Sequence, residues 1–357
     1  MASDTTAQHV PCAEPLVEVR RGPIVESRHR GHIAVVDPNG HMLADIGVAD
    51  TVTYLRSSLK AFQTLPVLLS GAADHFGFND KEVALACASH NGELMHTEIV
   101  AGMLHKIGVD PELLQCGIHE PYSVAAAHTL RDRGEKPTAL HNNCSGKHAA
   151  MLAFAKYLRA PLETYLDPTH PVQQAILDVV SRFSDVPVND LILGVDGCSA
   201  PVVAMPLKSM ALAYARLVNP PQGFDHELRE ACKRIVKVMT TYPELIGGTT
   251  DRLDTEIMKA VPGQLISKVG AEGVYTAGVL PNARYREGFG LALKIEDGDD
   301  HRARPTVVIE ALRQLGMLGD GALHCVARYA SFPVKNRNGN TVGEIRASFT
   351  LEMSEEV

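Results

Sequence analysis

The sequence predicts an α/β fold of the α+β kind, with an antiparallel sheet built from both ends of the chain and a helical lobe inserted between them. Strand patterns occupy residues 15–47 and return after about residue 262, whereas helical periodicity dominates the middle. Strands on both sides of a helical middle are expected when the two ends pair in one sheet. We therefore predict a single two-lobed catalytic domain over residues 1–357, with the sheet lobe at about 14–50 and 262–357 and the helical lobe at about 55–260.

The first strands are predicted from alternation and from one turn. Val17 and Val19 alternate with charged residues, and the apolar run 33–36 leads into Asp37-Pro38-Asn39-Gly40. That tetrapeptide has turn chemistry, so residues 42–46 should return as a partner strand. Later strands are predicted at 265–268, 273–280 and 288–295. A half-buried strand is predicted at 345–351, where every second residue is apolar.

Apolar residues in the middle of the chain recur every three or four positions, which is the helical period. One such face runs from Ile99 to Ile107 and should end at Gly108. A second helix is predicted over 172–183, with Thr169 as its cap and Pro171 in its first turn. Further helices are expected at 207–217, 226–240 and 303–315.

The composition is that of a globular protein and excludes several classes. Aromatic residues make up 5% of the 357 residues, tryptophan is absent and the net charge is −8, which argues against a nucleic-acid partner. No apolar run approaches the ~20 residues of a membrane span, and residues 1–15 lack the apolar segment of a signal peptide. Seven widely spread cysteines indicate reduced thiols and a cytoplasmic protein.

The stretch Arg56-Ser57-Ser58-Leu59-Lys60 opens an apolar, helix-like run. Ser57 and Lys60 are three residues apart, so on a helix a hydroxyl and an amine would be neighbours. A serine beside a lysine that burial keeps neutral is a nucleophile that needs no histidine. The alternative is a helix start with Ser57 as the N-cap and Lys60 in solvent.

Two later stretches complete a three-part pattern. Ser89-His90-Asn91 gives S-x-N, and Lys268-Val269-Gly270 gives K-x-G. Together with S-x-x-K, in this order, they form the signature of penicillin-binding proteins and serine β-lactamases. Lys268 would then face Ser89 and form a second serine–lysine pair. The alternatives are a turn at Asn91 and an edge lysine that discourages sheet pairing.

Polar residues crowd the stretch His141-Asn142-Asn143-Cys144-Ser145-Gly146-Lys147-His148, which indicates a polar site at the start of a helix. Asp196-Gly197-Cys198-Ser199 follows the strand-like run 191–195 and adds a second thiol and a carboxylate. The spacing of the two cysteines matches no metal motif. Composition alone therefore predicts buried, inert thiols.

These stretches resemble one family. Segments 54–60, 86–93, 141–148, 196–199 and 268–273 are similar to the asparaginase II family, the Rhizobium-type or class 3 L-asparaginases, over about residues 14–330. The resemblance implies a fold like those of serine β-lactamases, penicillin-binding proteins and glutaminases. It also implies a homodimer that hydrolyses the small molecule L-asparagine to L-aspartate and ammonia.

The resemblance also implies roles for individual residues. Two serine–lysine tandems would carry the reaction, with the first serine as the nucleophile: Ser57 with Lys60, and Ser89 with Lys268. A zinc ion would be held by two thiols and an amine, those of Cys144, Cys198 and Lys147. This revises the prediction that the two thiols are inert. Four side chains would line the pocket and bind the substrate: Arg56, Asn91, His148 and Asp196.

The chain departs from the family pattern in three places. Val269 stands where the family commonly has threonine, Leu59 stands where it often has cysteine, and a tail follows Phe332. Two other functions stay open. One is a glutaminase or another serine–lysine amidohydrolase or β-lactamase-like enzyme on the same fold. The other is a non-catalytic, zinc-dependent sensor of amino acids.

Overall fold

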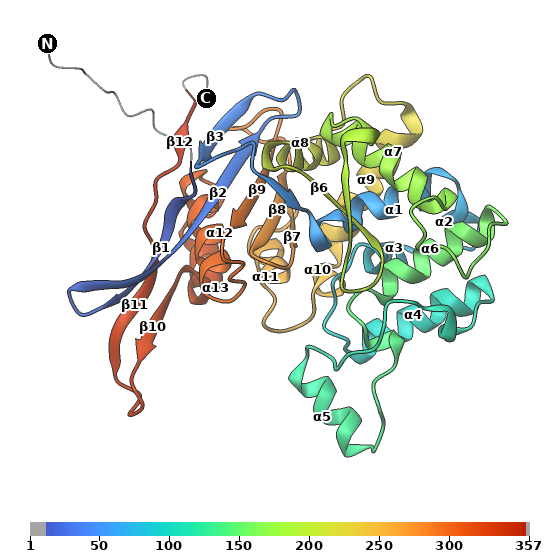
Figure 1. Cartoon of the computed structure of the whole chain (residues 1–357), viewed down its shortest axis with the longest axis horizontal. Coiled ribbons are helices and arrows are strands. Elements are labelled where there is room, and N and C mark those ends of the chain that lie inside the picture. Colours follow the sequence, from blue (N-terminus) through green and yellow to red (C-terminus); the bar gives the residue numbers. More distant parts are fainter. Residues whose placement is uncertain (1–11, 355–357) are drawn as a thin grey trace, which may run out of the picture.

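The structure is a computed structural model that describes residues 12–354 (Figure 1). Residues 1–11, which hold most of the segment considered for a signal peptide, lie outside the described residues. Within residues 12–354, no helix combines the length and the apolar character needed to cross a membrane.

One large antiparallel sheet is formed by strands from both ends of the chain. Its strand order is β10-β11-β1-β2-β9-β8-β7, and β3 pairs with both β2 and β12 beside this path. These strands are β1 (Glu14–Arg21), β2 (Ile24–Val36), β3 (Met42–Ile46), β7 (Leu265–Val269), β8 (Val274–Val279), β9 (Phe289–Ile295), β10 (Ser331–Lys335), β11 (Thr341–Ala347) and β12 (Glu352–Met353). The central pairing joins β2 to β9, with Ile33 opposite Leu293. The predicted sheet built from both ends is confirmed.

The helices occupy the chain between the two groups of strands and its last part. They are α1 (Lys60–Leu69), α2 (Ala72–His75), α3 (Asp80–Ala86), α4 (Leu94–Ile107), α5 (Val124–Asp132), α6 (Ser145–Tyr157), α7 (Pro171–Ser184), α8 (Leu207–Val218), α9 (His226–Thr241), α10 (Pro243–Ile246), α11 (Leu253–Ala260), α12 (Ala303–Gln314) and α13 (Asp320–Ala330). Most of them gather on the side of the sheet away from β10 and β11 (Figure 1). The five predicted helices are all present.

Some predicted boundaries differ from the structure. Helix α4 ends at Gly108 as predicted, with φ of 58° at this residue. The N-cap of α7 is His170 rather than Thr169, because His170 Nδ1 accepts the Val172 N–H at 3.2 Å while the Thr169 hydroxyl bonds Asp167. The strand predicted at 345–351 begins at 341 and ends at 347. Val17 of β1 lies opposite Ala347, and Pro15, two residues further along β1, has no N–H to give to the ladder.

Helix α8 connects the sheet to the first serine motif. It packs against β9, β8 and β2, and the carbonyl of Ala211 lies so close to Gly290 that no side chain would fit there. From the same helix, the Tyr214 hydroxyl donates to the Ser58 carbonyl at 2.7 Å. The buried ring of Phe62 meets Tyr214 edge-on. The sheet therefore fixes the position of the turn that carries Ser57.

Candidate active site

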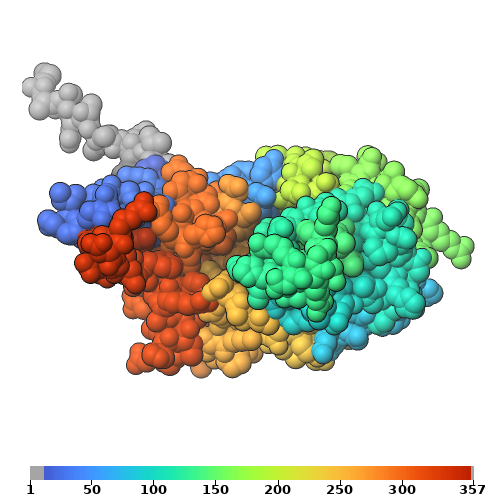
Figure 2. Space-filling model, turned by 90° about the horizontal axis from the view of Figure 1, so that it is seen from below, coloured from blue at the N-terminus to red at the C-terminus, as the bar shows by residue number. Residues whose placement is uncertain are grey.

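A cavity of about 990 Å³ opens between the segment that contains α5 and the later segments of the chain. Figure 2 shows these two regions facing each other across a hollow, the first in green and the later ones in gold and orange. Both serines of the predicted tandems line the cavity. The lining also includes polar and charged side chains from several elements, among them Asn91, Tyr122, Asn143, Arg252 and Arg304.

Ser57 is held on a tight turn at the surface of this cavity. It lies in a 3-10 helix, η1 (Arg56–Leu59), which runs directly into α1. Arg56 has φ of 52°, in the left-handed region that non-glycine residues rarely adopt, and such strained positions cluster at functional sites. Ser57 is half-buried, and its hydroxyl has no hydrogen bond to any residue within 12–354.

Lys60 is buried, with 1% of its surface exposed, so it is not the solvent-facing lysine of the N-cap alternative. Its amine donates to Ser89 Oγ at 2.8 Å, to the Ala88 carbonyl at 2.6 Å and to the Asn143 carbonyl at 3.3 Å. Burial lowers the pKa of Lys60. An amine with a lowered pKa spends more of its time neutral and able to accept a proton.

Lys268 reaches Ser89 from the opposite side. Its amine donates to Ser89 Oγ at 2.9 Å and lies 3.6 Å from Asp254 Oδ2. Burial lowers the pKa of Lys268 to about 7, against the opposing effect of the Asp254 carboxylate. Strand β7 does lie at the edge of the sheet, yet this side chain is 1% exposed, so the interpretation as a protective edge lysine is wrong.

The structure thus brings Ser89, Lys60 and Lys268 into one buried chain of hydrogen bonds. The backbone of Ser89 is fixed as well, because its N–H donates to the Ile246 carbonyl at 2.9 Å. The pairing of Ser89 with Lys268 has the geometry expected from the sequence. No hydrogen bond joins Ser57 to Lys60 among the described residues, because the Lys60 amine is directed to the chain segment after α3.

Two charged residues beside this chain were not identified from the sequence. Asp254 is fully buried in the first turn of α11 and lies 3.6 Å from the Lys268 amine and 3.5 Å from Arg252 Nε. Arg252 in turn donates to Asn91 Oδ1 at 2.9 Å. One signal was available in the sequence. Asp254 shares a helix face with Ile257 and Met258, and a carboxylate on an apolar face is buried only with a partner.

The predicted substrate-binding residues are found in different surroundings. Asn91 lines the cavity, as expected of a residue that meets substrate. Arg56 and Asp196 pair with each other, Nε to Oδ1 at 2.9 Å, and neither lines the cavity within the described part of the chain. His148 is fully buried and its Nδ1 lies 2.6 Å from the Tyr165 hydroxyl. That burial argues against direct contact between His148 and a substrate.

The three predicted metal ligands lie together. Cys144 precedes the first residue of α6, Lys147 lies in its first turn, and Cys198 follows strand β5 (Ile192–Val195). The Lys147 amine is 3.1 Å from Cys198 Sγ, and the Cys144 thiol lies beside that of Cys198. The interaction between the two thiols lowers the pKa of Cys144 and raises that of Cys198.

The donor set of this cluster suits zinc. No group of three His, Cys, Asp or Glu side chains with metal-site geometry occurs within residues 12–354, so a zinc ion at this cluster would need the Lys147 amine as its third donor. Zinc accepts sulfur and nitrogen ligands in a tetrahedral arrangement. The imidazole of the neighbouring His148 is buried beside Cys198, which leaves another nitrogen donor near the thiols. Burial alone lowers the pKa of Lys147, but Cys198 and Cys144 raise it overall, so this amine must lose its proton to bind metal.

The fold and the serine–lysine site define the class of the protein as a serine–lysine amidohydrolase. The family model of L-asparaginase II matches residues 17–347. The chain therefore belongs to the L-asparaginase II family.

Comparison with solved structures gives distant similarities. A Bacillus subtilis glutaminase in covalent complex with 5-oxo-L-norleucine is 13% identical, with a TM-score of 0.41 over 84% of this chain and 92% of that one. A β-lactamase from Burkholderia ambifaria is 17% identical, with a TM-score of 0.36 over 81% and 93% of the two chains. No curated protein matches the sequence significantly. Scores this low say nothing about the substrate of this chain.

Proposed function

We propose that the protein is an L-asparaginase, which hydrolyses the side-chain amide of L-asparagine to L-aspartate and ammonia. The observation that carries the proposal is the pair of buried lysine amines that meet on Ser89 Oγ, beside a cavity in which the Ser57 hydroxyl is free to react. Membership of the L-asparaginase II family supports asparagine as the substrate. A cytoplasmic location and a homodimer stay predictions from the sequence.

The reaction would proceed by acyl transfer in two steps. Ser57 Oγ attacks the amide carbon, and its proton enters the chain formed by Lys60, Ser89 and Lys268. The same chain delivers a proton to the amide nitrogen as the C–N bond breaks, so that ammonia leaves and an ester remains on Ser57. Water then attacks the ester, passes one proton back through the chain to Ser57 Oγ, and L-aspartate is released.

The activity should rise with pH through about 7. The hydrogen-bonded chain can accept the Ser57 proton only if one of its amines is unprotonated, so Lys268 has to be neutral in the free enzyme. With its pKa at about 7, Lys268 is protonated below that pH and neutral above it. We expect kcat/KM for asparagine, measured from about pH 5.5 to about pH 9, to increase and level off above about 7. In the Asp254→Asn variant, the rise in kcat/KM should occur at lower pH, because the Asp254 carboxylate raises the pKa of Lys268. A level or falling profile would contradict this role.

Zinc would be held by Cys144, Lys147 and Cys198, with the imidazole of His148 beside Cys198. When bound, zinc supplies Lewis acidity or fixes a substrate oxygen. We predict about one zinc per chain in elemental analysis after mild purification, with occupancy that falls as pH drops because the ligands must lose protons.

The variant Cys198→Ser should lose most of the zinc. Cys232→Ser is the matched control, since Cys232 is equally buried but lies in α9 and outside this cluster. A protein that contains no zinc and keeps full activity in the presence of a chelator would remove the metal from the proposal.

The proposed substrate is tested by ammonia release from L-asparagine and from L-glutamine, together with hydrolysis of a chromogenic β-lactam. Faster turnover of asparagine is the expected result. Preference for glutamine or for the β-lactam would instead show one of the other serine–lysine hydrolases. Tight binding of asparagine without release of ammonia would show a sensor.

A further inference from the structure

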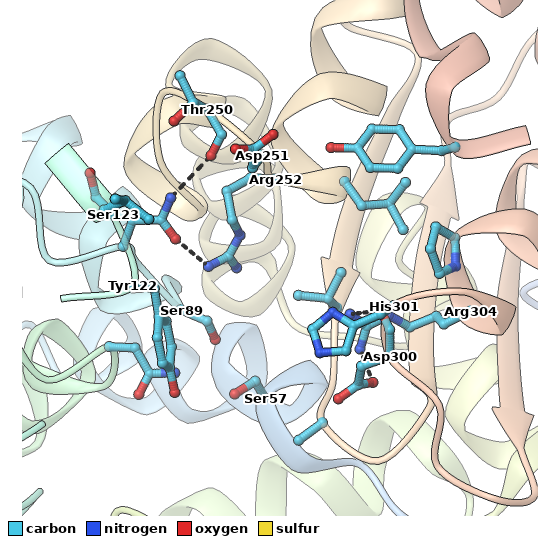
Figure 3. Close-up of a pocket in the computed structure, with 18 of the residues that line it drawn as sticks. Ser57, Ser89, Tyr122, Ser123, Thr250, Asp251, Arg252, Asp300, His301 and Arg304 are labelled. Atoms are coloured by element: carbon cyan, nitrogen blue, oxygen red, sulfur yellow. Dashed lines mark hydrogen bonds and ion pairs between the residues drawn. The ribbon is translucent and has the colours of Figure 1, made fainter. Parts of the chain in front are cut away.

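Arg252 has a role in the cavity that neither the sequence motifs nor the proposed chemistry accounts for. It immediately precedes α11, its side chain is 13% exposed, and its guanidinium group lines the cavity. Figure 3 shows this side chain directed into the space between Ser89 and the loop that carries His301. An arginine that is mostly buried and still faces open space is positioned to meet a ligand rather than bulk water.

The guanidinium group is fixed from behind. Its NH1 donates to Asn91 Oδ1 at 2.9 Å, and Asn91 Nδ2 donates to the Thr250 carbonyl at 3.2 Å (Figure 3). On its other side, Nε lies 3.5 Å from Oδ1 of the fully buried Asp254. A cation that is already ordered loses little further freedom when an anion binds. The planar guanidinium also matches the two oxygens of a carboxylate.

The charge around this position favours an anion. Arg252 and Lys268 both lie beside one buried carboxylate, Asp254, and of these two side chains Arg252 is the one that lines the cavity. Arg252 also donates from NH2 to Asp254 Oδ2 at 3.5 Å, but it shares this carboxylate with Lys268, whereas the other arginines near the cavity pair with different carboxylates. Arg56 is bonded to Asp196, and Arg304 is bonded to Asp300 and to the Gly270 carbonyl.

Arg252 shares its cavity with the reacting groups. Ser57, Ser89 and Arg252 all line the same space (Figure 3). In asparagine only two carbons separate the side-chain amide carbon from the α-carboxylate. A group that binds this carboxylate must therefore lie close to the serine that attacks the amide.

We propose that Arg252, oriented by Asn91 and Asp254, binds the α-carboxylate of the substrate. It thereby selects free amino acids that carry a side-chain amide over other primary amides. This proposal rests on the proposed function and names a specificity residue for it. It differs from the expectation that Arg56 holds the substrate charge. Bound this way, the substrate has its carboxylate on Arg252 and its amide at Ser57.

The test compares two substrates in matched variants. β-Alaninamide has the same amide and amino groups as asparagine but no α-carboxylate. We expect Arg252→Met to lower kcat/KM for asparagine by about 100-fold, mainly through KM, since a charge-assisted bidentate contact is lost. At about pH 9, where Lys268 should be neutral in both proteins, the same variant should change kcat/KM for β-alaninamide by less than about threefold. Arg252→Lys should restore only part of the asparagine loss because an amine cannot bind both oxygens at once.

Two control variants accompany this comparison. Arg182→Met removes an arginine that is also paired with a carboxylate, Asp225, but lies outside the cavity, and it should affect neither substrate. Arg56→Met should not reproduce the asparagine-selective loss. An equal fall for both substrates in Arg252→Met would mean a structural role, and a selective loss in Arg56→Met alone would transfer the role to Arg56. Either result overturns the inference.

A binding measurement separates this inference from the proposed function. Calorimetry with L-aspartate, and with β-alanine as the analogue without the α-carboxylate, needs no turnover. We expect Arg252→Met to weaken aspartate binding by about 100-fold and to leave the weak binding of β-alanine unchanged. If aspartate binding depends on Arg252 but asparagine releases no ammonia, the proposed function fails and the inference stands. If asparagine is hydrolysed and the variant binds aspartate as well as the wild type does, the inference fails and the function stands.

Discussion

Replacing Ser57 by alanine is expected to lower kcat for asparagine by about 10⁴-fold or more, the scale of loss seen when a nucleophile is removed. The Ser57 hydroxyl lines the cavity and makes no hydrogen bond within residues 12–354, so it is free to attack. For the same reason its removal breaks no contact, and the free energy of unfolding should change by less than about 0.5 kcal/mol.

The measurement is ammonia release in a coupled assay, with thermal unfolding recorded on the same samples. Ser70→Ala is a suitable control, because Ser70 follows α1 and bonds only the local backbone. Ser89→Ala should also lose activity, by about 10²- to 10³-fold, since it removes the oxygen that joins the two lysines. If Ser57→Ala kept near-normal activity and Ser89→Ala had none, the nucleophile would be Ser89.

The parts of the fold that sequence reasoning predicted are those with a local cause. Strand β3 follows the turn at Asp37–Gly40, where the Gly40 N–H bonds the Asp37 carbonyl at 3.1 Å. Helix α4 ends at Gly108 because only a residue that tolerates positive φ fits there. Strand β10 was missed and β11 was predicted with shifted ends, because both strands are largely exposed or half-buried and their apolar pattern is weak.

The candidate site shows where local reasoning ends. The three-residue spacing of Ser57 and Lys60 placed both in one turn, but spacing does not say which hydroxyl the amine will meet. The partner of the Lys60 amine is decided by its burial against the segment after α3, where Ser89 Oγ and the Ala88 carbonyl accept its hydrogen bonds. Arg252 and Asp254 were missed for a related reason. Their function depends on contacts with Asn91 and Lys268, which are distant in the sequence.

The Lys60→Met variant is the second change with a large expected effect. Methionine has a similar length and no donor, so the hydrogen bonds to Ser89 Oγ, the Ala88 carbonyl and the Asn143 carbonyl are lost together. We expect kcat to fall by about 10³-fold or more, because the chain can no longer take the Ser57 proton. Ser89 Oγ keeps the Lys268 amine and the Asn143 carbonyl keeps the His90 N–H, so within residues 12–354 only the Ala88 carbonyl loses its donor, which should cost about 1–3 kcal/mol of stability. Lys156→Met is the matched control, since Lys156 bonds only the Gly108 carbonyl at the surface.

The double variant Ser57→Ala/Lys60→Met separates a catalytic unit from two independent contributions. If Lys60 acts by accepting the Ser57 proton, it has nothing to accept once Ser57 is alanine, so the double variant should be no slower than Ser57→Ala alone. Independent effects would multiply and give a further loss of about 10³-fold. The absence of a direct hydrogen bond between these two residues makes the distinction informative. Non-additive losses would mean that the Ser57 proton is transferred to Lys60 through the chain of Lys60, Ser89 and Lys268. Losses that multiply would mean that Lys60 only holds Ser89 in place.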